Sequence, residues 1–275
     1  MSDVIKLSST ATGEYWELHV LFEDGDLLAL DKPSLLLTSP DRDNLRRPSL
    51  MQLLHAAIER GVPWTRKRGL TYLMNAHRLD FETSGVILLA KTKPVLVALA
   101  NLFGDEKLNK IYVALVHGTP LENSFTIDAK LAPHPVNLGL MRVDQKHGKR
   151  SRSEFQVRER FTNCTLLECR PLTERKHQIR AHLRHAGWPI VGDERYGGGP
   201  LWLSRLKTDY RLKPNKSERP LISHAALHIE QLRLTHPVTG ADLHITAPWP
   251  KDLTVAVKYL RRYAGQGGPQ LETEH

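Results

Sequence analysis

The chain of 275 residues is 40% hydrophobic and 25% charged, a composition that is typical of globular proteins and sufficient for one large core or two smaller ones. No apolar run approaches the ~18 residues that a membrane-spanning helix needs. The chain does not begin with a basic segment followed by an apolar one, so we expect neither a membrane protein nor a secretory signal. The net charge of +9 and the pI near 9.6 favour a polyanionic partner, of which nucleic acid is the commonest.

Hydrophobic patterning predicts strands and helices in the N-terminal part of the chain. Ser49 is suited to cap a helix that Gly61 and Pro63 then end, and Pro94 is suited to the first position of another helix. In chain order we expect a strand at 27–30, a helix at 50–60, a strand at 86–90, a helix that begins at Pro94 and a strand at 111–116.

The C-terminal part is predicted to begin with two paired strands. Thr173 is a candidate N-cap for the next helix, with Glu174 in its first turn near the positive end of the helix dipole, and Gly187 is expected to end it. The expected elements are strands at 155–157 and 165–169, a helix at 173–186, two strands at 228–234 and 242–246 joined by a turn at 237–240, and a helix at 255–263.

Strands outnumber helices and do not alternate with them regularly, which predicts an α+β fold with a mixed, largely antiparallel sheet core and flanking helices. No linker separates two domains, so we expect one domain over residues 1–264, with 1–20 as an N-terminal extension. Residues 192–220 are interpreted as an insertion or flexible loop, and residues 265–275 as a disordered tail. Cys164 and Cys169, five residues apart in a predicted strand, would face opposite sides, which indicates free, buried thiols and a cytoplasmic location.

Basic residues gather in three clusters. Each cluster could be an ordinary solvated surface, but three of them together favour contacts with phosphates. The clusters are Lys146, His147, Lys149, Arg150 and Arg152; Arg175, Lys176, Arg180, Arg184 and His185; and Arg42, Arg46, Arg47, Arg66, Lys67 and Arg68.

A polar segment precedes the buried strand at 86–90. Arg78 and Asp80 are two residues apart, so in an extended segment they would share a face and could pair. A surface loop with a salt bridge explains these features as well as a reactive site does, and the segment alone leaves both explanations open.

Further motifs give this segment a context, because it resembles the signature of the RluA-type pseudouridine synthase family. The resemblance begins with His77, Arg78, Leu79 and Asp80, followed by Thr83, Ser84, Gly85, an apolar strand and Lys91. Four other motifs match in order and spacing: Asp31 to Pro33; Lys110 to Gly118; Pro171 to Leu183; and a C-terminal set with Gly192, Asp193, Tyr196, Gly197, His228 and His236.

The chain departs from the family pattern at two positions. Leu35 stands where the first turn usually has glycine, and Glu174 stands where the third motif usually has glycine. Neither change removes a group that the chemistry needs. Many members carry a small N-terminal RNA-binding domain, for which the segment before the first motif is too short, so we expect this domain to be absent.

The resemblance implies a pseudouridine synthase fold with a central active-site cleft and an RNA-modifying isomerase activity. Asp80 would be the essential aspartate, which either attacks C1′ of the target uridine or takes a proton from C2′. Arg180 would pair with Asp80 and keep the carboxylate ionised. Tyr112 would stack on the target base or assist proton transfer at C5.

The resemblance also implies a set of substrate-binding residues. His77 and Arg78 would help to flip the target nucleotide, and Ile179 would form a wall of the pocket. Arg175 and His177 complete the expected contacts with the RNA. The expected partner is rRNA or tRNA, with no membrane, no obligatory protein partner, no metal and no other cofactor, and the protein is expected to be a monomer.

Several alternatives compete with this interpretation. A catalytically inactive RNA-binding or ribosome-assembly factor with the same fold is the main one, although Asp80, Tyr112 and Arg180 are all in place. A glycosidase that uses Asp80 and Glu82 has no other support. The histidines lack the spacing of a zinc helix, the glycine run at 197–199 lacks the lysine of a phosphate-binding loop, and no nucleophile elbow is present.

Overall fold

The computed structural model describes residues 3–41, 46–104, 108–212 and 215–265. Contacts divide the chain into two compact units. Unit 1 comprises Met1–Lys110 and Ile229–Pro248, and unit 2 comprises Ile111–His228 and Trp249–His275. Each unit is therefore built from segments that are far apart in the sequence. The expectation of a single domain over residues 1–264 stays a prediction.

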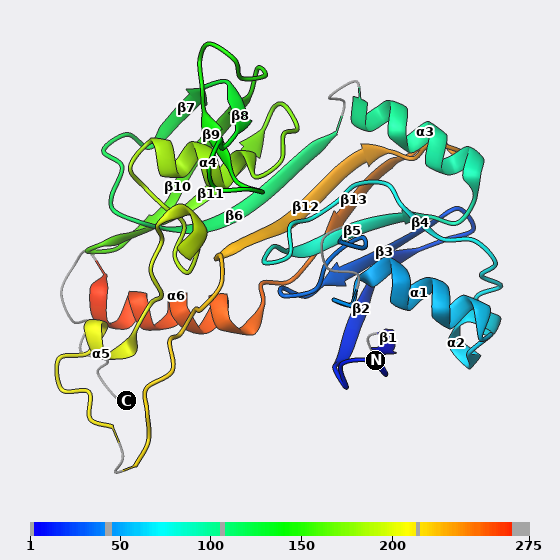
Figure 1. Cartoon of the computed structure of the whole chain (residues 1–275), viewed down its shortest axis with the longest axis horizontal. Helices are drawn as coiled ribbons and strands as arrows, with labels where there is room; N and C mark the ends of the chain where they lie inside the picture. Colours follow the sequence, from blue (N-terminus) through cyan, green and yellow to red (C-terminus); the bar gives the residue numbers. More distant parts are fainter. Residues whose placement is uncertain (1–2, 42–45, 105–107, 213–214, 266–275) are drawn as a thin grey trace, which may run out of the picture. The chain divides into compact units, whose positions relative to one another are not determined.

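The strands of unit 1 form a largely antiparallel sheet around two strands that are buried along nearly their whole length. β3 (Leu27–Lys32) pairs antiparallel with β5 (Ser84–Ala90), and Leu27 lies opposite Ala90. Each strand contains a continuous apolar run, at 27–30 in β3 and at 86–90 in β5, which explains why the sequence predicted them. The strand order is β1 (Val4–Ser8), β2 (Tyr15–Glu23), β3, β5 and β12 (Leu227–Thr235), with β4 (Met74–Asn75) beside β5 and β13 (Asp242–Thr246) beside β12 (Figure 1).

The helices of unit 1 begin where local chemistry places them. α1 (Leu50–Glu59) has Ser49 as N-cap, whose hydroxyl accepts a hydrogen bond of 3.3 Å from the Gln52 amide, as predicted. Gly61 has a φ of +56° just beyond the end of this helix. Pro63, expected only as a stop, begins the short helix α2 (Pro63–Lys67) at its first position. α3 (Lys93–Gly104) confirms the helix predicted at Pro94.

Unit 2 contains an antiparallel set of four strands and a separate hairpin. The order is β6 (Asn109–His117, of which Ile111 onward lies in unit 2), β11 (Cys164–Pro171), β10 (Arg152–Arg160) and β7 (Ser124–Asp128). The hairpin consists of β8 (Leu131–Pro133) and β9 (Met141–Val143). Cys164 and Cys169 are both buried and free, as predicted, and burial raises the pKa of Cys164 to about 11. The α+β fold class is confirmed.

The helices of unit 2 correct one predicted start. α4 (Gln178–His185) has His177 as N-cap, and His177 adopts a left-handed φ of 54°, so the prediction of a helix from Thr173 is wrong. Thr173 instead accepts a hydrogen bond from the Arg152 amide at 3.0 Å. Glu174 consequently lies on a loop rather than in a first helical turn. The last helix, α6 (Lys251–Ala264), begins four residues earlier than predicted, directly after Pro250.

The segment 192–220 is packed against unit 2 at its beginning. Asp193, Tyr196 and Leu201 are buried, and the Leu221 amide donates to the Leu201 carbonyl oxygen at 2.7 Å. The segment contains a 3-10 helix, η1 (Glu194–Tyr196), and the short helix α5 (Leu203–Leu206). The interpretation as a flexible loop is therefore wrong for its first part, while the predicted tail lies outside the described residues from position 266 onward. Within the described ranges no helix has the length and apolar character needed to cross a membrane.

Candidate active site

The loop that carries Asp80 in unit 1 is held by backbone hydrogen bonds. The buried Thr38 hydroxyl donates to the Leu79 carbonyl oxygen at 2.9 Å and accepts from the Leu79 amide at 3.0 Å. The Thr83 amide donates to the Asp80 carbonyl oxygen at 3.2 Å. These bonds fix the main chain on both sides of the Asp80 side chain, which is what a preorganised reactive group requires.

Side chains along this loop alternate between the interior and the surface. His77 and Leu79 are buried, while Arg78 is exposed and Asp80 is half-buried. The alternation agrees with the expectation that Arg78 and Asp80 share a face. The Arg47 guanidinium also lies 4.7 Å from the centre of the Phe81 ring, which places one residue of the third basic cluster beside the loop.

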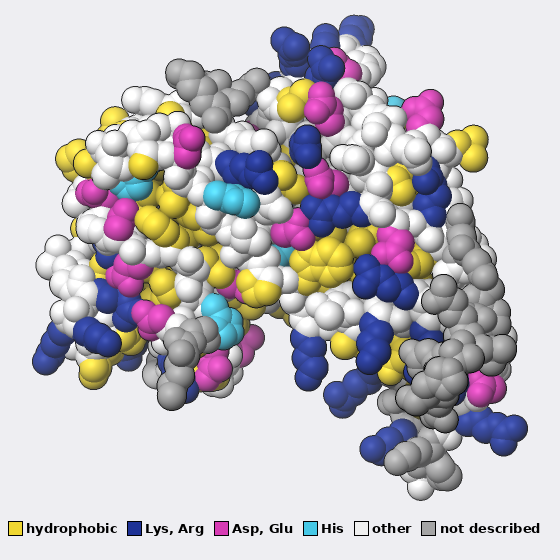
Figure 2. All heavy atoms as spheres, turned by 180° about the vertical axis from the view of Figure 1, so that it is seen from behind, with side chains coloured by type: hydrophobic (Ala, Val, Ile, Leu, Met, Phe, Trp, Pro, Cys, Tyr) yellow, Lys and Arg dark blue, Asp and Glu magenta, His cyan; other side chains and the backbone are white. Residues whose placement is uncertain are grey.

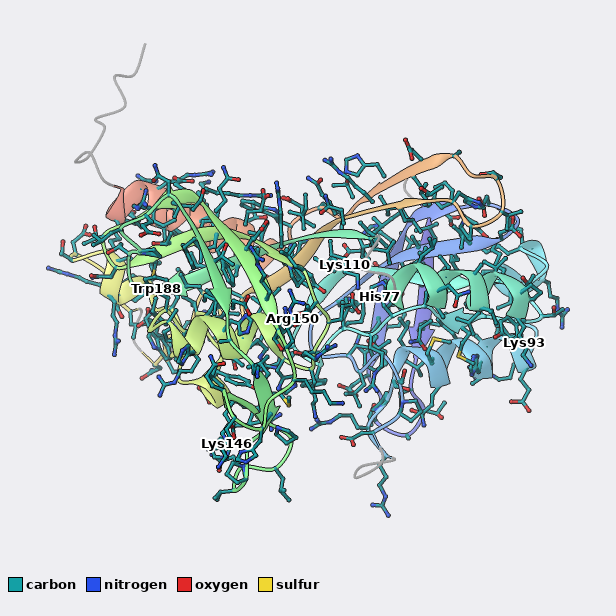
Figure 3. All side chains as sticks on the ribbon, turned by 90° about the horizontal axis from the view of Figure 1, so that it is seen from above. His77, Lys93, Lys110, Lys146, Arg150 and Trp188 are labelled. Carbon is teal, nitrogen blue, oxygen red and sulfur yellow. The ribbon has the colours of Figure 1, made fainter. Side chains whose placement is uncertain are left out.

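His77 is 7% exposed, and its Nε2 accepts a hydrogen bond of 3.1 Å from the Leu88 amide. Burial lowers the pKa of His77 well below its usual value, with a further contribution from Lys110. The two residues lie close together within unit 1 (Figure 3). This environment favours a neutral His77 that anchors the loop to β5, and the role of His77 in nucleotide flipping stays a prediction.

A fully buried lysine lies beneath the loop, and the prediction of site residues did not include it. Lys32 is 0% exposed, and its Nζ donates hydrogen bonds of 2.7 Å to the carbonyl oxygens of Pro33 and Leu36. Burial lowers the pKa of Lys32 to about 7, while the negative charges of Asp80 and Asp31 oppose this shift. Its signal in the sequence was its place in the first motif, directly before Pro33.

The turn that Lys32 holds contains the first departure from the family pattern. Leu35 has a φ of 61°, a left-handed conformation that glycine adopts without strain and leucine does not. Gly85, after the Asp80 loop, also has a positive φ, of 105°, and it lies against a neighbouring strand. A Cβ atom there would lie 2.2 Å from the Ile229 carbonyl oxygen of β12, so only glycine fits.

Two candidate residues of unit 2, Arg180 and His177, contact Tyr196. Arg180 is 2% exposed, and its Nε and Nη2 donate hydrogen bonds of 2.7 Å each to the two carboxylate oxygens of Asp193. The guanidinium carbon lies 5.0 Å from the centre of the Tyr196 ring. The Tyr196 hydroxyl is 2.8 Å from Nδ1 of His177 and accepts a hydrogen bond of 2.9 Å from the Met141 amide.

Sequence analysis missed Asp193 and Tyr196 as partners of Arg180 and His177, although both residues stand in a matched motif. The Tyr196 hydroxyl accepts a hydrogen bond from the Met141 amide and forms a second one with Nδ1 of His177. This network fixes Arg180 and His177 relative to each other. The pairing of Arg180 with Asp80 of unit 1 stays a prediction.

The other predicted residues of unit 2 differ in exposure. Tyr112 is half-buried on β6 and packs against the main core of the unit, in which Ile179 is 6% exposed. Arg175 is exposed, and its Nη1 donates to the Glu174 carbonyl oxygen at 2.8 Å. Tyr112 and Ile179 can therefore form the wall of a pocket, whereas Arg175 is placed to reach a ligand at the surface.

Two basic clusters meet at one hollow in unit 2. A pocket of about 490 Å³ lies beside the β8–β9 hairpin, and we call it the β8–β9 pocket. Lys149 of the first cluster and Arg175 and Lys176 of the second line it. Its lining also includes Leu131, Met141 and Glu174.

In the third basic cluster, Arg68 forms ion pairs within the protein and does not line the β8–β9 pocket. The Arg68 side chain is only 9% exposed and forms ion pairs with Asp3 and Glu23. Arg42 lies outside the described residues. On the face that Figure 2 shows, lysine and arginine side chains are interspersed with carboxylates, so positive charge is spread rather than confined to one patch there.

His236 lies near two carboxylates, and its hydrogen bonds account for this arrangement without a metal ion. In the described part of the chain, Asp24, Asp26 and His236 are the residues close enough together to hold a metal ion. Nδ1 of His236 accepts hydrogen bonds from the Val238 and Thr239 amides, so its proton lies on Nε2, which donates to Asp24 at 2.9 Å. This arrangement fits a structural hydrogen bond better than a metal site.

The chain is similar to known proteins in sequence and in fold. A family model described as RNA pseudouridylate synthase matches residues 26–185. The chain is 36% identical to the ribosomal large subunit pseudouridine synthase D of Nitrosomonas europaea over 248 residues, which are 89% of this chain and 65% of that protein. It is 33% identical to the synthase D of Xanthomonas campestris, covering 94% of this chain and 74% of that protein.

The chain is also similar to a synthase C and to a solved structure. The ribosomal large subunit pseudouridine synthase C of Salmonella typhi is 33% identical over 89% of this chain and 70% of that protein. The structure of human RNA pseudouridylate synthase domain containing 4 has a TM-score of 0.65 and 23% identity, covering 88% of this chain and 92% of that one. The latter match shows the fold.

Proposed function

The chain belongs to the RNA pseudouridylate synthase family, and from this premise we propose that it isomerises specific uridines in RNA to pseudouridine. The observation that carries the proposal is the complete set of Asp80, Tyr112 and Arg180 in matched motifs, with Asp80 on a loop and Arg180 on a helix that hydrogen bonds hold in place and Tyr112 on strand β6. The resemblance to RluA-type enzymes therefore extends from the family to the groups that the reaction needs.

In this proposal Asp80 is the catalytic residue. Its carboxylate either attacks C1′ or removes a proton from C2′, after which the freed uracil turns and rejoins the ribose through C5. Lys32 beneath the loop places positive charge near the carboxylate when it is protonated, and the negative charge of Asp80 in turn acts to raise the pKa of Lys32. Arg180 supplies a second positive charge, and its bond to Asp193 orients the guanidinium.

Tyr112 acts at the target base, and Arg78 acts at the position that the base leaves. An aromatic ring can stack on the flipped uracil or assist proton transfer at C5, whereas an exposed guanidinium beside Asp80 can occupy the gap in the RNA. The reaction as proposed needs no cofactor. Arg175 contacts the RNA at the surface, and His177 positions neighbouring groups through Tyr196.

The proposed substrate is ribosomal RNA of the large subunit. We base this part of the proposal on the relatives, which are called ribosomal large subunit pseudouridine synthases. Transfer RNA stays the alternative substrate. Mapping pseudouridines in both RNAs from cells with and without the gene distinguishes the two, because only the true substrate loses a modified position.

The activity itself is tested by tritium release from RNA that carries 5-³H-uridine. Formation of the new bond at C5 displaces the label into water, so a synthase releases it and an inactive RNA-binding or ribosome-assembly factor does not. Release from rRNA transcripts supports the proposal. Stable RNA binding without release from either rRNA or tRNA would favour the inactive factor.

A further inference from the structure

The Thr38 hydroxyl connects two segments of unit 1 that lie 41 residues apart in the chain. It donates a hydrogen bond of 2.9 Å to the Leu79 carbonyl oxygen and accepts one of 3.0 Å from the Leu79 amide. A hydroxyl can do both, because one oxygen carries a proton and two lone pairs. Thr38 and Leu79 are 2% and 6% exposed, so these bonds lie in the interior, where a polar group that loses its partner is costly.

The Leu79 carbonyl group belongs to the peptide unit that leads into Asp80. Because a peptide unit is planar, a hydrogen bond to this oxygen also restricts the Asp80 amide and Cα atom. The peptide unit after Asp80 is held as well, since the Thr83 amide donates to the Asp80 carbonyl oxygen at 3.2 Å. The Thr38 side chain therefore restricts the main chain before Asp80, the turn to Thr83 restricts it after Asp80, and together they define the backbone dihedrals of Asp80.

Thr38 is itself attached to the N-terminal end of α1. The Leu50 amide donates to the Leu37 carbonyl oxygen at 2.8 Å, and the Met51 amide donates to the Thr38 carbonyl oxygen at 3.1 Å. Both amides belong to the first turn of the helix, where amides have no acceptor within the helix. The backbone of Thr38 is thus fixed to a helix, and its side chain extends this attachment to Leu79.

The bond between His77 and β5 restricts a different part of the loop. Nε2 of His77 accepts from the Leu88 amide at 3.1 Å, which attaches the loop to the strand before it reaches Asp80. This bond involves neither of the peptide units that flank Asp80. Of these two attachments, the one through Thr38 is therefore better placed to set the direction of the Asp80 side chain.

We propose that Thr38 is a positioning residue for the reaction, because its hydroxyl orients the peptide unit before Asp80 and thereby directs the Asp80 carboxylate. This role rests on the proposed function, in which that carboxylate reacts at C1′ or C2′. A displacement of about 1 Å at a reacting group can lower a rate by about 100-fold. Loss of the hydroxyl is expected to slow the reaction and to leave RNA binding unchanged, since Thr38 is buried and does not reach the RNA.

Thr38→Val and Thr38→Ser separate the hydroxyl from the shape of the side chain. Valine keeps the branched shape and removes both hydrogen bonds, whereas serine keeps the hydroxyl and removes the methyl group. In single-turnover tritium release at saturating enzyme, we expect Thr38→Val to lower the rate by roughly 10- to 100-fold and Thr38→Ser to stay within about threefold of the wild type. Fluorescence anisotropy with the same RNA is expected to give wild-type affinity for both variants.

Thr65→Val is the matched control for the loss of a buried hydroxyl. Thr65 is 1% exposed in the same unit, and its hydroxyl donates to the Val62 carbonyl oxygen at 2.8 Å. This variant is expected to lose stability in urea denaturation and to keep the wild-type rate of tritium release. If Thr38→Val does not fold, Thr38→Ala takes its place in the same comparison, because alanine removes the hydroxyl without placing a methyl group against the polar atoms of Leu79.

The pattern of rates and affinities decides whether Thr38 positions Asp80. A wild-type rate in Thr38→Val would overturn the proposal, as would a loss of RNA affinity without a loss of rate. Equal loss of rate in Thr38→Val and Thr38→Ser would assign the effect to the methyl group, and equal loss in Thr65→Val would assign it to general loosening of unit 1; both would contradict the role of the hydroxyl. These results leave the proposed function intact, whereas a wild type that releases no tritium would refute the proposed function and this role with it.

Discussion

The guanidinium of Arg180 meets the carboxylate of Asp193 through two hydrogen bonds of 2.7 Å each. Both side chains are buried, at 3% and 0% exposure. Buried ion pairs of this geometry are costly to break, because the remaining charge is left without compensation. The pair therefore fixes one of the three predicted catalytic groups at a defined place in unit 2.

Asp193→Asn is expected to lower the free energy of unfolding by about 3 kcal/mol or more, because it leaves the Arg180 charge without its partner in the interior. The measurement is urea denaturation. Glu17→Gln, which removes one member of the exposed Lys6–Glu17 pair, is the control and should leave stability nearly unchanged. Similar effects of the two substitutions would show that burial does not strengthen the Arg180–Asp193 pair.

Leu35→Gly is expected to stabilise the protein by about 0.5–1 kcal/mol. Removal of the left-handed strain gains about 1–2 kcal/mol, and the greater freedom of glycine in the unfolded chain offsets part of it. Leu212→Gly is a matched control, since Leu212 is 46% exposed against 47% for Leu35 and has no positive φ. The control should lose stability, and a loss of equal size at Leu35 would contradict the strain argument.

His77 is expected to make the protein sensitive to acid. Its folded-state pKa is lowered by burial, so below pH ~6.5, the ordinary value for histidine, the unfolded chain binds a proton that the folded chain does not. Stability is therefore complete above this pH and falls as the pH decreases, by up to about 1.4 kcal/mol per pH unit for this residue.

The comparison that isolates His77 uses urea denaturation between pH 7 and 5. His77→Gln lacks the titrating group, so its stability should fall less steeply with acid than that of the wild type, whatever the two proteins' stabilities at pH 7. Parallel curves would mean that His77 is protonated as readily in the folded state as in the unfolded state.

RNA affinity is expected to fall steeply with salt, because lysine and arginine side chains displace counterions from the phosphates. Arg175→Gln should make a log–log plot of affinity against salt less steep by about one counterion. Arg68→Gln should leave the slope unchanged, since Arg68 pairs with Asp3 and Glu23. Fluorescence anisotropy with a labelled RNA measures both slopes, and a flat response of the wild type would remove the basic clusters from the RNA-binding surface.

Local signals predicted much of the fold. The apolar runs at 27–30 and 86–90 defined β3 and β5, and Ser49 with Gly61 defined α1, because these features depend only on neighbouring residues. The strands β1 and β2 were missed because residues 1–20 were interpreted as an extension, although buried and exposed residues alternate in β1. The start of α4 was misplaced because the left-handed conformation of His177 depends on contacts with Tyr196, which is distant in the sequence.

In the candidate site, too, the sequence indicated individual residues but not the contacts between residues that are distant in the sequence. Asp80, Tyr112 and Arg180 were assigned through motifs, and these assignments stay predictions. The surroundings of these residues could not be assigned, since Asp193 meets Arg180 across a loop and Lys32 reaches the Asp80 loop only through the pairing of β3 with β5. The predicted dipole role of Glu174 failed when the helix proved to begin at Gln178, and that displacement placed Glu174 at the β8–β9 pocket.

Tritium release by Asp80→Asn, with 5-³H-uridine RNA as substrate, tests the central claim most directly. Asparagine retains the size of the side chain but can neither attack C1′ nor accept a proton from C2′. The expected result is loss of release with RNA binding retained, while Glu82→Gln on the same loop continues to release the label. Release by Asp80→Asn at the rate of the wild type would contradict the assignment of Asp80 and with it the proposed mechanism.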